Sequence, residues 1–244
     1  MKVLIIDDER LARQELKSLL LDYSEVEIVG EANNADEGIK QIIEKHPDLI
    51  FLDIQMPGKN GFEMLEELDS VPLVVFVTAY DEYALKAFEV NAMDYLLKPI
   101  QTKRLDEALK KVMQLEKKNK EQYQPVHPVI QDILGENDQV FVKDGEKCWF
   151  VKLAEIRLFE SEGNYIRVYF NGNRPLILKS LNSLEERLNS KVFFRASRKH
   201  IINLKWIDKI ESWFNGGLMV TLNGGEQVEI SRRQAAKFRE MMSL

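Results

Sequence analysis

The stretch Leu49-Ile50-Phe51-Leu52-Asp53-Ile54-Gln55-Met56-Pro57-Gly58 decides the fold of the first half of the chain. Four consecutive apolar residues, closed by an aspartate and followed by a Pro-Gly turn, are typical of a parallel strand buried between two helical layers. Similar apolar runs lie at residues 3–6, 27–32, 49–53, 73–78 and 94–97, and amphipathic helical segments separate them. This alternation predicts an α/β fold with a doubly wound, five-stranded parallel sheet.

The composition is that of a folded protein with room for two domains. The 244 residues are 45% hydrophobic and 30% charged, which excludes a disordered or fibrous chain. No apolar run reaches the roughly 18 residues that a membrane span needs, so we expect no membrane insertion and no signal-directed export. A single cysteine, Cys148, forms no internal disulfide, and three scattered histidines do not suggest a zinc site. We therefore expect a cytoplasmic protein.

The net charge of −6 is unevenly distributed. Residues 1–123 carry 16 Lys and Arg against 25 Asp and Glu, whereas residues 124–244 carry 18 against 15, so the halves hold −9 and +3. Six basic residues and one acidic residue lie within 191–209, namely Lys191, Arg195, Arg198, Lys199, Lys205, Lys209 and Asp208. This segment predicts either a surface that faces an anion or an ordinary solvated face.

The hydrophobic pattern changes in the second half of the chain. A charged stretch runs into Pro125 and Pro128, which predicts a linker over 119–135 between a domain at 1–118 and another at 136–244. Short strand-like runs follow at 139–143, 147–152, 156–160, 165–170, 175–178, 206–213, 217–222 and 227–230. Only 180–189, with Ser183 as its predicted cap, and 232–242 look helical, so the second domain is predicted to be mostly β.

Polar residues follow four of the five strands predicted for the first domain. Because the carboxyl ends of parallel strands form one edge of a sheet, Asp7, Asp8, Asp53, Thr78 and Lys98 should converge there. Three carboxylates that repel one another are best accommodated around Mg²⁺, which prefers oxygen ligands. A carboxylate beside Mg²⁺, a hydroxyl and an ammonium group can attack a phosphoryl group, so the predicted chemistry is formation of an aspartyl phosphate. Each element alone is commonly a cap, a structural hydroxyl or a turn, but the combination, in order and at the ends of predicted strands, indicates a functional site.

Four strings in this half resemble the receiver domain of bacterial two-component response regulators. They are Ile5-Ile6-Asp7-Asp8-Glu9, Leu52-Asp53-Ile54-Gln55-Met56-Pro57-Gly58-Lys59-Asn60-Gly61, Val77-Thr78-Ala79-Tyr80 and Asp94-Tyr95-Leu96-Leu97-Lys98-Pro99. The resemblance implies that Asp53 is the phosphoacceptor and that Asp7, Asp8, Asp53 and the Gln55 backbone carbonyl hold Mg²⁺. It also implies that Thr78 and Lys98 sense the phosphoryl group and that Tyr95 is an aromatic switch, although Tyr95 is alternatively a tyrosine at the edge of the core.

The family switch predicts a change on one face of the domain. When a phosphoryl group draws Thr78 and Lys98 toward Asp53, the Thr78 loop moves and Tyr95 turns into the vacated space. Residues 80–91 and 103–111 would line the altered face, which similar receivers use to form homodimers. The partner implied upstream is a sensor histidine kinase.

Three strings in the second half resemble the LytTR family of DNA-binding domains. They are residues 156–165, residues 194–204, which read Phe-Arg-Ala-Ser-Arg-Lys-His-Ile-Ile-Asn-Leu, and Ile230-Ser231-Arg232-Arg233. The resemblance implies a β fold that presents loops to successive major grooves. The DNA-contact candidates are Asn164, Tyr165, Arg198, Lys199, Asn203, Arg232 and Arg233.

Each DNA-contact candidate has a simpler structural alternative. Asn203 can instead cap a turn, Arg232 and Arg233 can begin a solvated helix, and Tyr165 can pack at a strand start. The aromatic residues Trp206, Trp213 and Phe214 are expected to be core.

The combined prediction is a response regulator in which phosphorylation of Asp53 promotes dimerisation and sequence-specific binding to duplex promoter DNA with repeated half-sites. The alternative is a phosphorylation-controlled regulator that binds protein or RNA. An aspartyl phosphatase is disfavoured because Asp7-Asp8-Glu9 lacks the DxD pattern of such enzymes. The only predicted catalysis is Mg²⁺-dependent self-phosphotransfer and slow autodephosphorylation.

Overall fold

The computed structural model describes residues 1–79, 94–121, 133–145 and 147–242 of the chain. Contacts divide the described residues into two compact units. The first unit spans Met1–Pro128 together with Gln139–Phe141 and Gly145–Phe150, and the second contains the remainder. No helix in the described ranges has the length and apolarity needed to cross a membrane.

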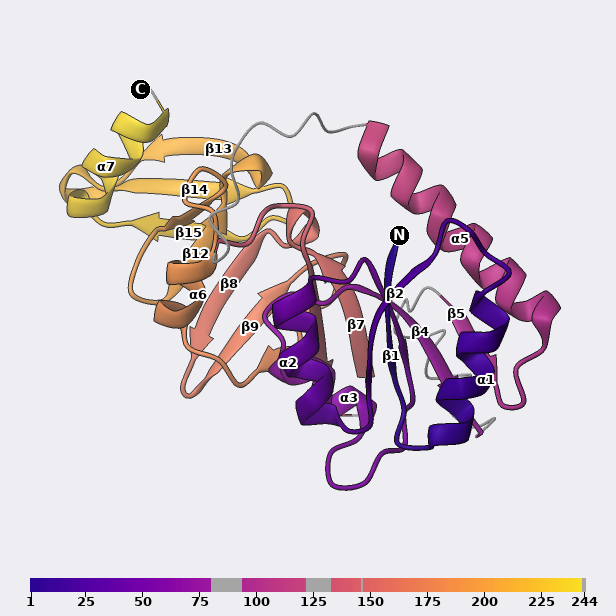
Figure 1. The fold of residues 1–244 in the computed structure, drawn as a ribbon. Helices are drawn as coiled ribbons and strands as arrows, with labels where there is room; N and C mark the ends of the chain where they lie inside the picture. Colours follow the sequence, from indigo (N-terminus) through magenta and orange to yellow (C-terminus); the bar gives the residue numbers. More distant parts are fainter. Residues whose placement is uncertain (80–93, 122–132, 146, 243–244) are drawn as a thin grey trace. The chain divides into compact units, whose positions relative to one another are not determined.

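The first unit is built on a parallel sheet with strand order β2-β1-β3-β4-β5, as predicted. Figure 1 shows helices on both sides of this sheet. The strands are β1 (Lys2–Ile6), β2 (Glu27–Ala32), β3 (Leu49–Leu52), β4 (Leu73–Thr78) and β5 (Asp94–Leu97). The helices are α1 (Arg10–Leu20), α2 (Ala35–Lys45), α3 (Gly61–Glu67) and α5 (Thr102–Glu121).

Alternate residues along the strands pack into two separate hydrophobic cores, one on each face of this sheet. Leu4 and Ile6 pack with α2 and α3, whereas Val3 and Ile5 pack with α1 and α5. All four residues of β3 are buried, which agrees with a strand covered on both faces. The carboxyl edge of the sheet therefore rests on a rigid, fully packed support.

A two-stranded hairpin of β6 (Gln139–Asp144) and β7 (Lys147–Lys152) contributes to both units. Phe141, Cys148 and Phe150 belong to the core that contains α2 and α3, and the Phe141 and Phe150 rings are 5.1 Å apart. The sequence pattern assigns this hairpin to the second domain, whereas the contacts divide it. Helix α5 extends three residues into the predicted linker, to Glu121, and residues 122–132 of that linker lie outside the described ranges.

The second unit is mostly β, as predicted. A five-stranded sheet has the order β10-β9-β8-β12-β11, and a three-stranded antiparallel sheet has the order β13-β14-β15. The first contains β8 (Leu158–Glu162), β9 (Tyr165–Tyr169), β10 (Leu176–Ile177), β11 (Phe193–Arg195) and β12 (His200–Asn203), and the second contains β13 (Ile207–Ser212), β14 (Leu218–Leu222) and β15 (Gln227–Ile230). Three short 3-10 turns, η1 (Leu153–Glu155), η2 (Leu204–Trp206) and η3 (Phe214–Gly216), and the helices α6 (Leu181–Arg187) and α7 (Arg232–Met242) complete the unit.

Three local details differ from the sequence predictions. Helix α6 is capped by Ser180, whose side chain accepts from the Ser183 backbone N–H, so Ser183 is capped and is not the cap. Strands β11 and β12 lie within the basic segment, at residues for which no strand was predicted. Trp213 and Phe214 are 38% and 75% exposed, so the expectation that both are core residues is wrong.

Candidate functional site

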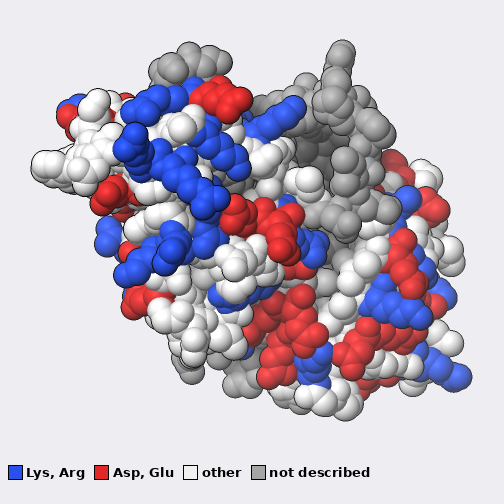
Figure 2. Space-filling view, turned by 90° about the vertical axis from the view of Figure 1, so that its left-hand side faces the viewer, with Lys and Arg blue, Asp and Glu red and all other residues white. Residues whose placement is uncertain are grey.

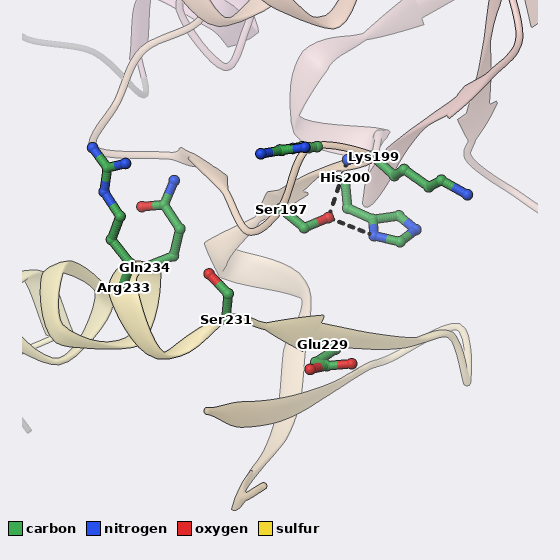
Figure 3. Close-up of a pocket in the computed structure, with 8 residues that line it drawn as sticks. Ser197, Lys199, His200, Glu229, Ser231, Arg233 and Gln234 are labelled. Carbon is green, nitrogen blue, oxygen red and sulfur yellow. Dashed lines mark hydrogen bonds between the residues drawn. The ribbon is translucent and has the colours of Figure 1, made fainter. Parts of the chain in front are cut away.

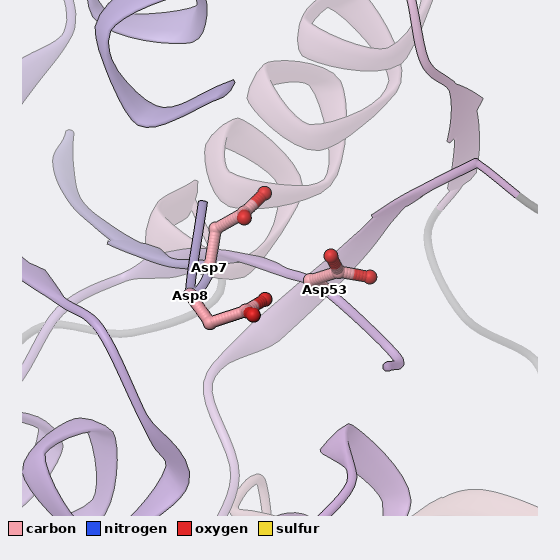
Figure 4. A group of neighbouring side chains, drawn as sticks. All are labelled: Asp7, Asp8 and Asp53. Carbon is pink, nitrogen blue, oxygen red and sulfur yellow. The ribbon is translucent and has the colours of Figure 1, made fainter. Parts of the chain in front are cut away.

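Three carboxylates from two strand ends converge at the carboxyl edge of the parallel sheet. Asp7 and Asp8 directly follow β1, and Asp53 directly follows β3. One carboxylate oxygen from each lies within 4.8 Å of the others (Figure 4). The convergence that the strand order predicted is therefore present, and the oxygen donors suit a hard divalent cation.

The ammonium group of Lys98 bridges two of these carboxylates. Its Nζ lies 2.7 Å from Asp53 Oδ2 and 2.8 Å from Asp7 Oδ2, and all three side chains are largely buried. Burial opposes the charged form of Lys98, but the hydrogen bonds to Asp53 and Asp7 outweigh it and raise its pKa to about 12. Burial raises the pKa of Asp7 above its ordinary value, and Lys98 offsets only part of that effect. Lys98 thus serves as the counter-ion of the cluster.

Thr78, the last residue of β4, presents a hydroxyl without a partner at the same edge. The residue is completely buried, and its Oγ1 forms no hydrogen bond within the described parts of the chain. Leaving a buried hydroxyl unpaired costs about 1–3 kcal/mol, so such groups need an explanation. A phosphoryl oxygen at Asp53 is a suitable acceptor for this hydroxyl.

The backbone around Asp53 is held by short contacts. The Asp53 backbone N–H donates to the Ile6 carbonyl at 2.8 Å, and the Gln55 backbone N–H donates to Asp53 Oδ1 at 3.1 Å. The Gln55 main chain therefore lies beside the cluster, as its predicted role in metal binding requires. A Cβ on Gly61 would lie 2.5 Å from the Asp53 carbonyl oxygen, so the close approach of α3 depends on this glycine.

Arg13, on α1, supports the cluster and was not predicted from the sequence. Its Nη1 donates to the backbone carbonyls of Asp7 at 2.7 Å and Asp8 at 3.2 Å, and its Nε lies 3.5 Å from Glu31. The only sequence signal was an arginine one helical turn into the segment after the aspartate pair, which is common on solvated helices.

Tyr95, the predicted switch residue, faces the core in this structure. It is 7% exposed and belongs to the cluster packed against α2 and α3. Beside it, the buried carboxylate of Asp94 pairs with Arg104 at 2.8 Å and Lys111 at 2.7 Å on α5. The predicted dimer face at 103–111 therefore carries an ion-pair network, whereas 80–91 lies outside the described residues.

Two segments of the second unit that were predicted to contact DNA line one pocket of about 720 Å³. Figure 3 shows Ser231, Arg233 and Gln234 approaching from the start of α7, opposite Ser197, Lys199 and His200. Arg198 and Glu229 also line it. The pocket brings together three of the predicted cationic contacts, Arg198, Lys199 and Arg233. Figure 2 shows Lys and Arg side chains gathered on part of the face in view.

The six basic residues of 191–209 separate into two groups. Arg195 pairs with Glu185, Lys205 with Glu136 and Lys209 with Glu211. Among the residues that the structure describes, Lys191, Arg198, Lys199 and also Arg233 have no ion-pair partner. The ion pairs, which the sequence does not reveal, therefore leave Lys191, Arg198, Lys199 and Arg233 as the basic side chains available to an anion.

Asn203, a predicted DNA contact, does not lie at the surface in this structure. Asn203 is completely buried, its Nδ2 donates to the Ile156 carbonyl at 2.9 Å, and its Oδ1 accepts from the Lys205 backbone at 3.0 Å. Both ends of the amide are thus occupied. The alternative reading, that Asn203 caps a turn, is confirmed by its position at the start of η2.

The remaining DNA-contact candidates lie on the surface. Asn164 and Tyr165 follow Gly163, whose φ of 63° forms the tight turn between β8 and β9, and Tyr165 is 48% exposed. Arg232, at the first position of α7, is exposed. It lies next to η3, because its Cγ would be 3.7 Å from a Cβ added to Gly216. The exposed Trp213 and Phe214 rings contact each other edge to face at 4.9 Å.

Comparison with known proteins assigns each half of the chain to a domain family. The family model of the response regulator receiver domain matches residues 3–110, and that of the LytTr DNA-binding domain matches residues 146–243. The sensory transduction protein LytT of Enterococcus faecalis is 34% identical over 247 residues, which cover 100% of both chains. The chain belongs to the LytTR family of response regulators.

Other relatives of this LytTR response regulator agree. The transcriptional regulatory protein LytR of Staphylococcus aureus is 33% identical over 248 residues, with 100% of both chains covered. The solved response regulatory domain of protein mrkE from Klebsiella pneumoniae is 38% identical and covers 48% of this chain and 99% of its own, with a TM-score of 0.44. The two family models thus show a response regulator receiver domain followed by a LytTr DNA-binding domain.

The acidic cluster of this response regulator fits Mg²⁺. Asp7, Asp8 and Asp53 offer only oxygen donors, which is the ligand set that a hard cation requires. Within the described parts of the chain, the Lys98 ammonium pairs with Asp7 and Asp53, and one positive charge does not balance three carboxylates. The Gln55 backbone carbonyl is the further ligand that the family implies.

Proposed function

We propose that a sensor histidine kinase phosphorylates Asp53, and that phosphorylation promotes dimerisation and sequence-specific binding to promoter DNA with repeated half-sites. The observation that carries this proposal is the convergence of Asp53 with two further carboxylates, the Lys98 ammonium and the unpaired Thr78 hydroxyl. An ordinary structural ion pair explains Lys98 but leaves the buried hydroxyl of Thr78 without a purpose.

In the proposed transfer, an Asp53 carboxylate oxygen attacks the phosphorus of a phosphohistidine. The new O–P bond forms as the N–P bond breaks, and the electron pair returns to the imidazole nitrogen of the kinase, which then takes up a proton. Mg²⁺ held by Asp7, Asp8, Asp53 and the Gln55 carbonyl neutralises charge on the transferring oxygens when it is bound. The protein residues orient the acceptor, since Asp53 is fixed by the backbone contacts of Ile6 and Gln55.

Lys98 and Thr78 read the product. Lys98, which bridges Asp7 and Asp53 before transfer, turns its ammonium toward the phosphoryl oxygens. Thr78 donates its unpaired hydroxyl to the same group, and the movement of β4's end vacates space into which the Tyr95 ring turns. The face at residues 103–111 then favours a second copy.

The proposed output uses the unpaired cations of the second unit. Arg198 and Arg233 hold guanine edges or phosphates, and Lys199 holds a phosphate, while Asn164, Tyr165 and Arg232 complete the surface. A weakly basic unit binds one half-site weakly, so two linked copies on repeated half-sites gain affinity through avidity. We place the functional domains at 1–118 and 136–244, joined by the linker 119–135.

The test combines phosphorylation with DNA selection. Purified full-length protein is incubated with acetyl phosphate and Mg²⁺, and the phosphorylated fraction is separated on a phosphate-affinity gel. Wild type and Asp36→Asn, a control on an exposed aspartate, should be modified, whereas Asp53→Asn should not. Genomic duplex fragments are then selected with each protein, and phosphorylation should raise enrichment of a repeated motif for wild type and Asp36→Asn but not for Asp53→Asn.

Two results would contradict parts of the proposal. Equal modification of Asp53→Asn would move the acceptor to another residue. Modification of wild type without any enriched duplex motif would instead favour the alternative output, in which the basic pocket meets RNA or a protein.

A further inference from the structure

The loop that carries Arg198 and Lys199 is held in place by its own neighbours in the chain. It joins β11 to β12, and the Ala196 backbone N–H donates to the His200 carbonyl at 3.0 Å to close it. Within the loop, the Ser197 hydroxyl accepts from the Lys199 backbone N–H at 3.1 Å (Figure 3). Outside the loop, the Lys199 carbonyl accepts from the Ser161 backbone N–H at 2.8 Å.

Arg195, the last residue of β11, binds the backbone of this loop. Its Nε donates to the Ser197 carbonyl at 2.7 Å and its Nη2 donates to the Arg198 carbonyl at 2.9 Å. Its third nitrogen, Nη1, lies 3.3 Å from Glu185 on α6, and the side chain is only 14% exposed. All three nitrogens are therefore occupied inside the domain, so this cation is not free to meet a phosphate.

His200 supports the loop from its other side. Its Nδ1 lies 3.0 Å from the Ser197 hydroxyl, and its Nε2 lies 3.4 Å from Glu160 Oε1. Glu160 is held in turn by the Tyr169 hydroxyl, which donates to its Oε2 at 2.5 Å. The Ser197 peptide is thus fixed both through its carbonyl, by Arg195, and through its side chain, by His200.

We infer that Arg195 is a positioning residue for DNA binding, which acts through Arg198 and Lys199 and touches no DNA itself. The inference rests on the proposed DNA-binding function. Arg198 and Lys199 have no side-chain partner within the described residues, so their location depends on the backbone of the loop. A guanidinium that binds two successive carbonyls fixes that backbone before DNA arrives, which lowers the ordering cost of binding.

A double-mutant cycle separates positioning from contact. DNA affinity is measured at one fixed salt concentration for wild type, Arg195→Gln, Arg198→Ala and Arg195→Gln with Arg198→Ala. A parallel cycle replaces Arg198→Ala with Arg233→Ala, the matched control on α7. We expect Arg195→Gln to weaken binding about tenfold, to weaken it by less in the Arg198→Ala background, where only Lys199 remains to be positioned, and to act independently of Arg233→Ala.

Two charge variants sharpen the test. Arg195→Lys keeps the charge but cannot donate to both carbonyls in the same geometry, so it should lose affinity as Arg195→Gln does. Glu185→Gln removes an acidic group, which by charge alone would strengthen DNA binding, whereas loss of the Arg195 anchor weakens it. Weaker binding by both variants supports positioning, and unchanged or stronger binding overturns it.

A readout without DNA guards against simple misfolding. Hydrogen exchange at the Lys199 and Ser161 amides should accelerate in Arg195→Gln, while the amides of β14 keep their protection. If Arg195→Gln fails to fold, Arg195→Lys and Glu185→Gln carry the test. Full additivity of Arg195→Gln with Arg198→Ala overturns the inference alone, whereas wild type that selects no duplex sequence overturns the proposed function with it.

Discussion

Neutralising the three unpaired cations of the pocket should change how DNA binding depends on salt. Arg198, Lys199 and Arg233 have no ion-pair partner in the described structure, whereas Lys205 and Lys209 pair with Glu136 and Glu211. Each phosphate contact adds about 0.9 to the slope of log affinity against log salt. If all three cations meet phosphates, the triple alanine variant should lower that slope by about 2.7 per bound copy.

The corresponding effect on affinity is large enough to measure. Between 50 and 200 mM salt, a slope difference of about 2.7 corresponds to roughly a 40-fold smaller loss of affinity for the triple variant than for wild type. The assay is fluorescence anisotropy with a labelled duplex that carries the selected motif, over a salt series. The control variant replaces Lys205 and Lys209 with alanine and should keep the wild-type slope.

A control variant that flattens the slope as much as the triple variant would contradict this expectation. That outcome would show that total charge governs binding and that pairing does not separate the two groups. A triple variant with weaker binding but an unchanged slope would instead assign the three residues to base edges, because base contacts release few counterions.

Three further changes probe the two units. Lys98→Met removes the cation that competes for Asp53, so Mg²⁺ should bind about tenfold more tightly, as measured by the rise of the unfolding temperature with Mg²⁺; an unchanged response contradicts this. Gly61→Ala places a Cβ 2.5 Å from the Asp53 carbonyl, so unfolding should become easier by about 1–3 kcal/mol and labelling by acetyl phosphate slower; normal labelling would show that the loop yields. Glu226→Gln breaks a buried pair with Arg157, so it should cost about 3 kcal/mol at neutral pH. Hydrogen bonds from Arg157 hold the pKa of Glu226 below its ordinary value of 4.5, so this stabilisation is complete above 4.5 and disappears as pH falls through the folded pKa; a cost that persists in urea titrations at low pH refutes the assignment.

The acidic site was predictable because topology alone brings its members together. Once Asp53 and Asp7 are read as strand ends of one parallel sheet, their proximity follows from the strand order. The unpaired state of Thr78 was not predictable, since it depends on the packing of every neighbour. Arg13 escaped for a similar reason, because an arginine on an amphipathic helix carries no sign of which carbonyls it meets.

The DNA-contact surface was harder to predict because burial and pairing decide it. Asn203 and Arg198 both belong to strings that resemble the family, but Asn203 is buried between η2 and the Ile156 carbonyl while Arg198 is exposed. Arg195 has the same charge as Arg198, but its guanidinium donates hydrogen bonds to the backbone carbonyls of the loop. Trp213 and Phe214 show the converse, since apolar character predicted burial that the hairpin does not provide.

The buried hydroxyl of Thr78 also bears on how readily the receiver switches. The Thr78 hydroxyl lacks a hydrogen bond in the unphosphorylated structure. If it gains one after phosphorylation, the cost of an unsatisfied buried hydroxyl falls on the resting conformation and not on the active one. In the proposed switch, the energy recovered at Thr78 can offset part of the cost of repacking the Tyr95 ring. If Asp53 is phosphorylated as proposed, the hydrogen bond gained by Thr78 lowers the free energy of the active state relative to the resting one and so shifts the population toward it.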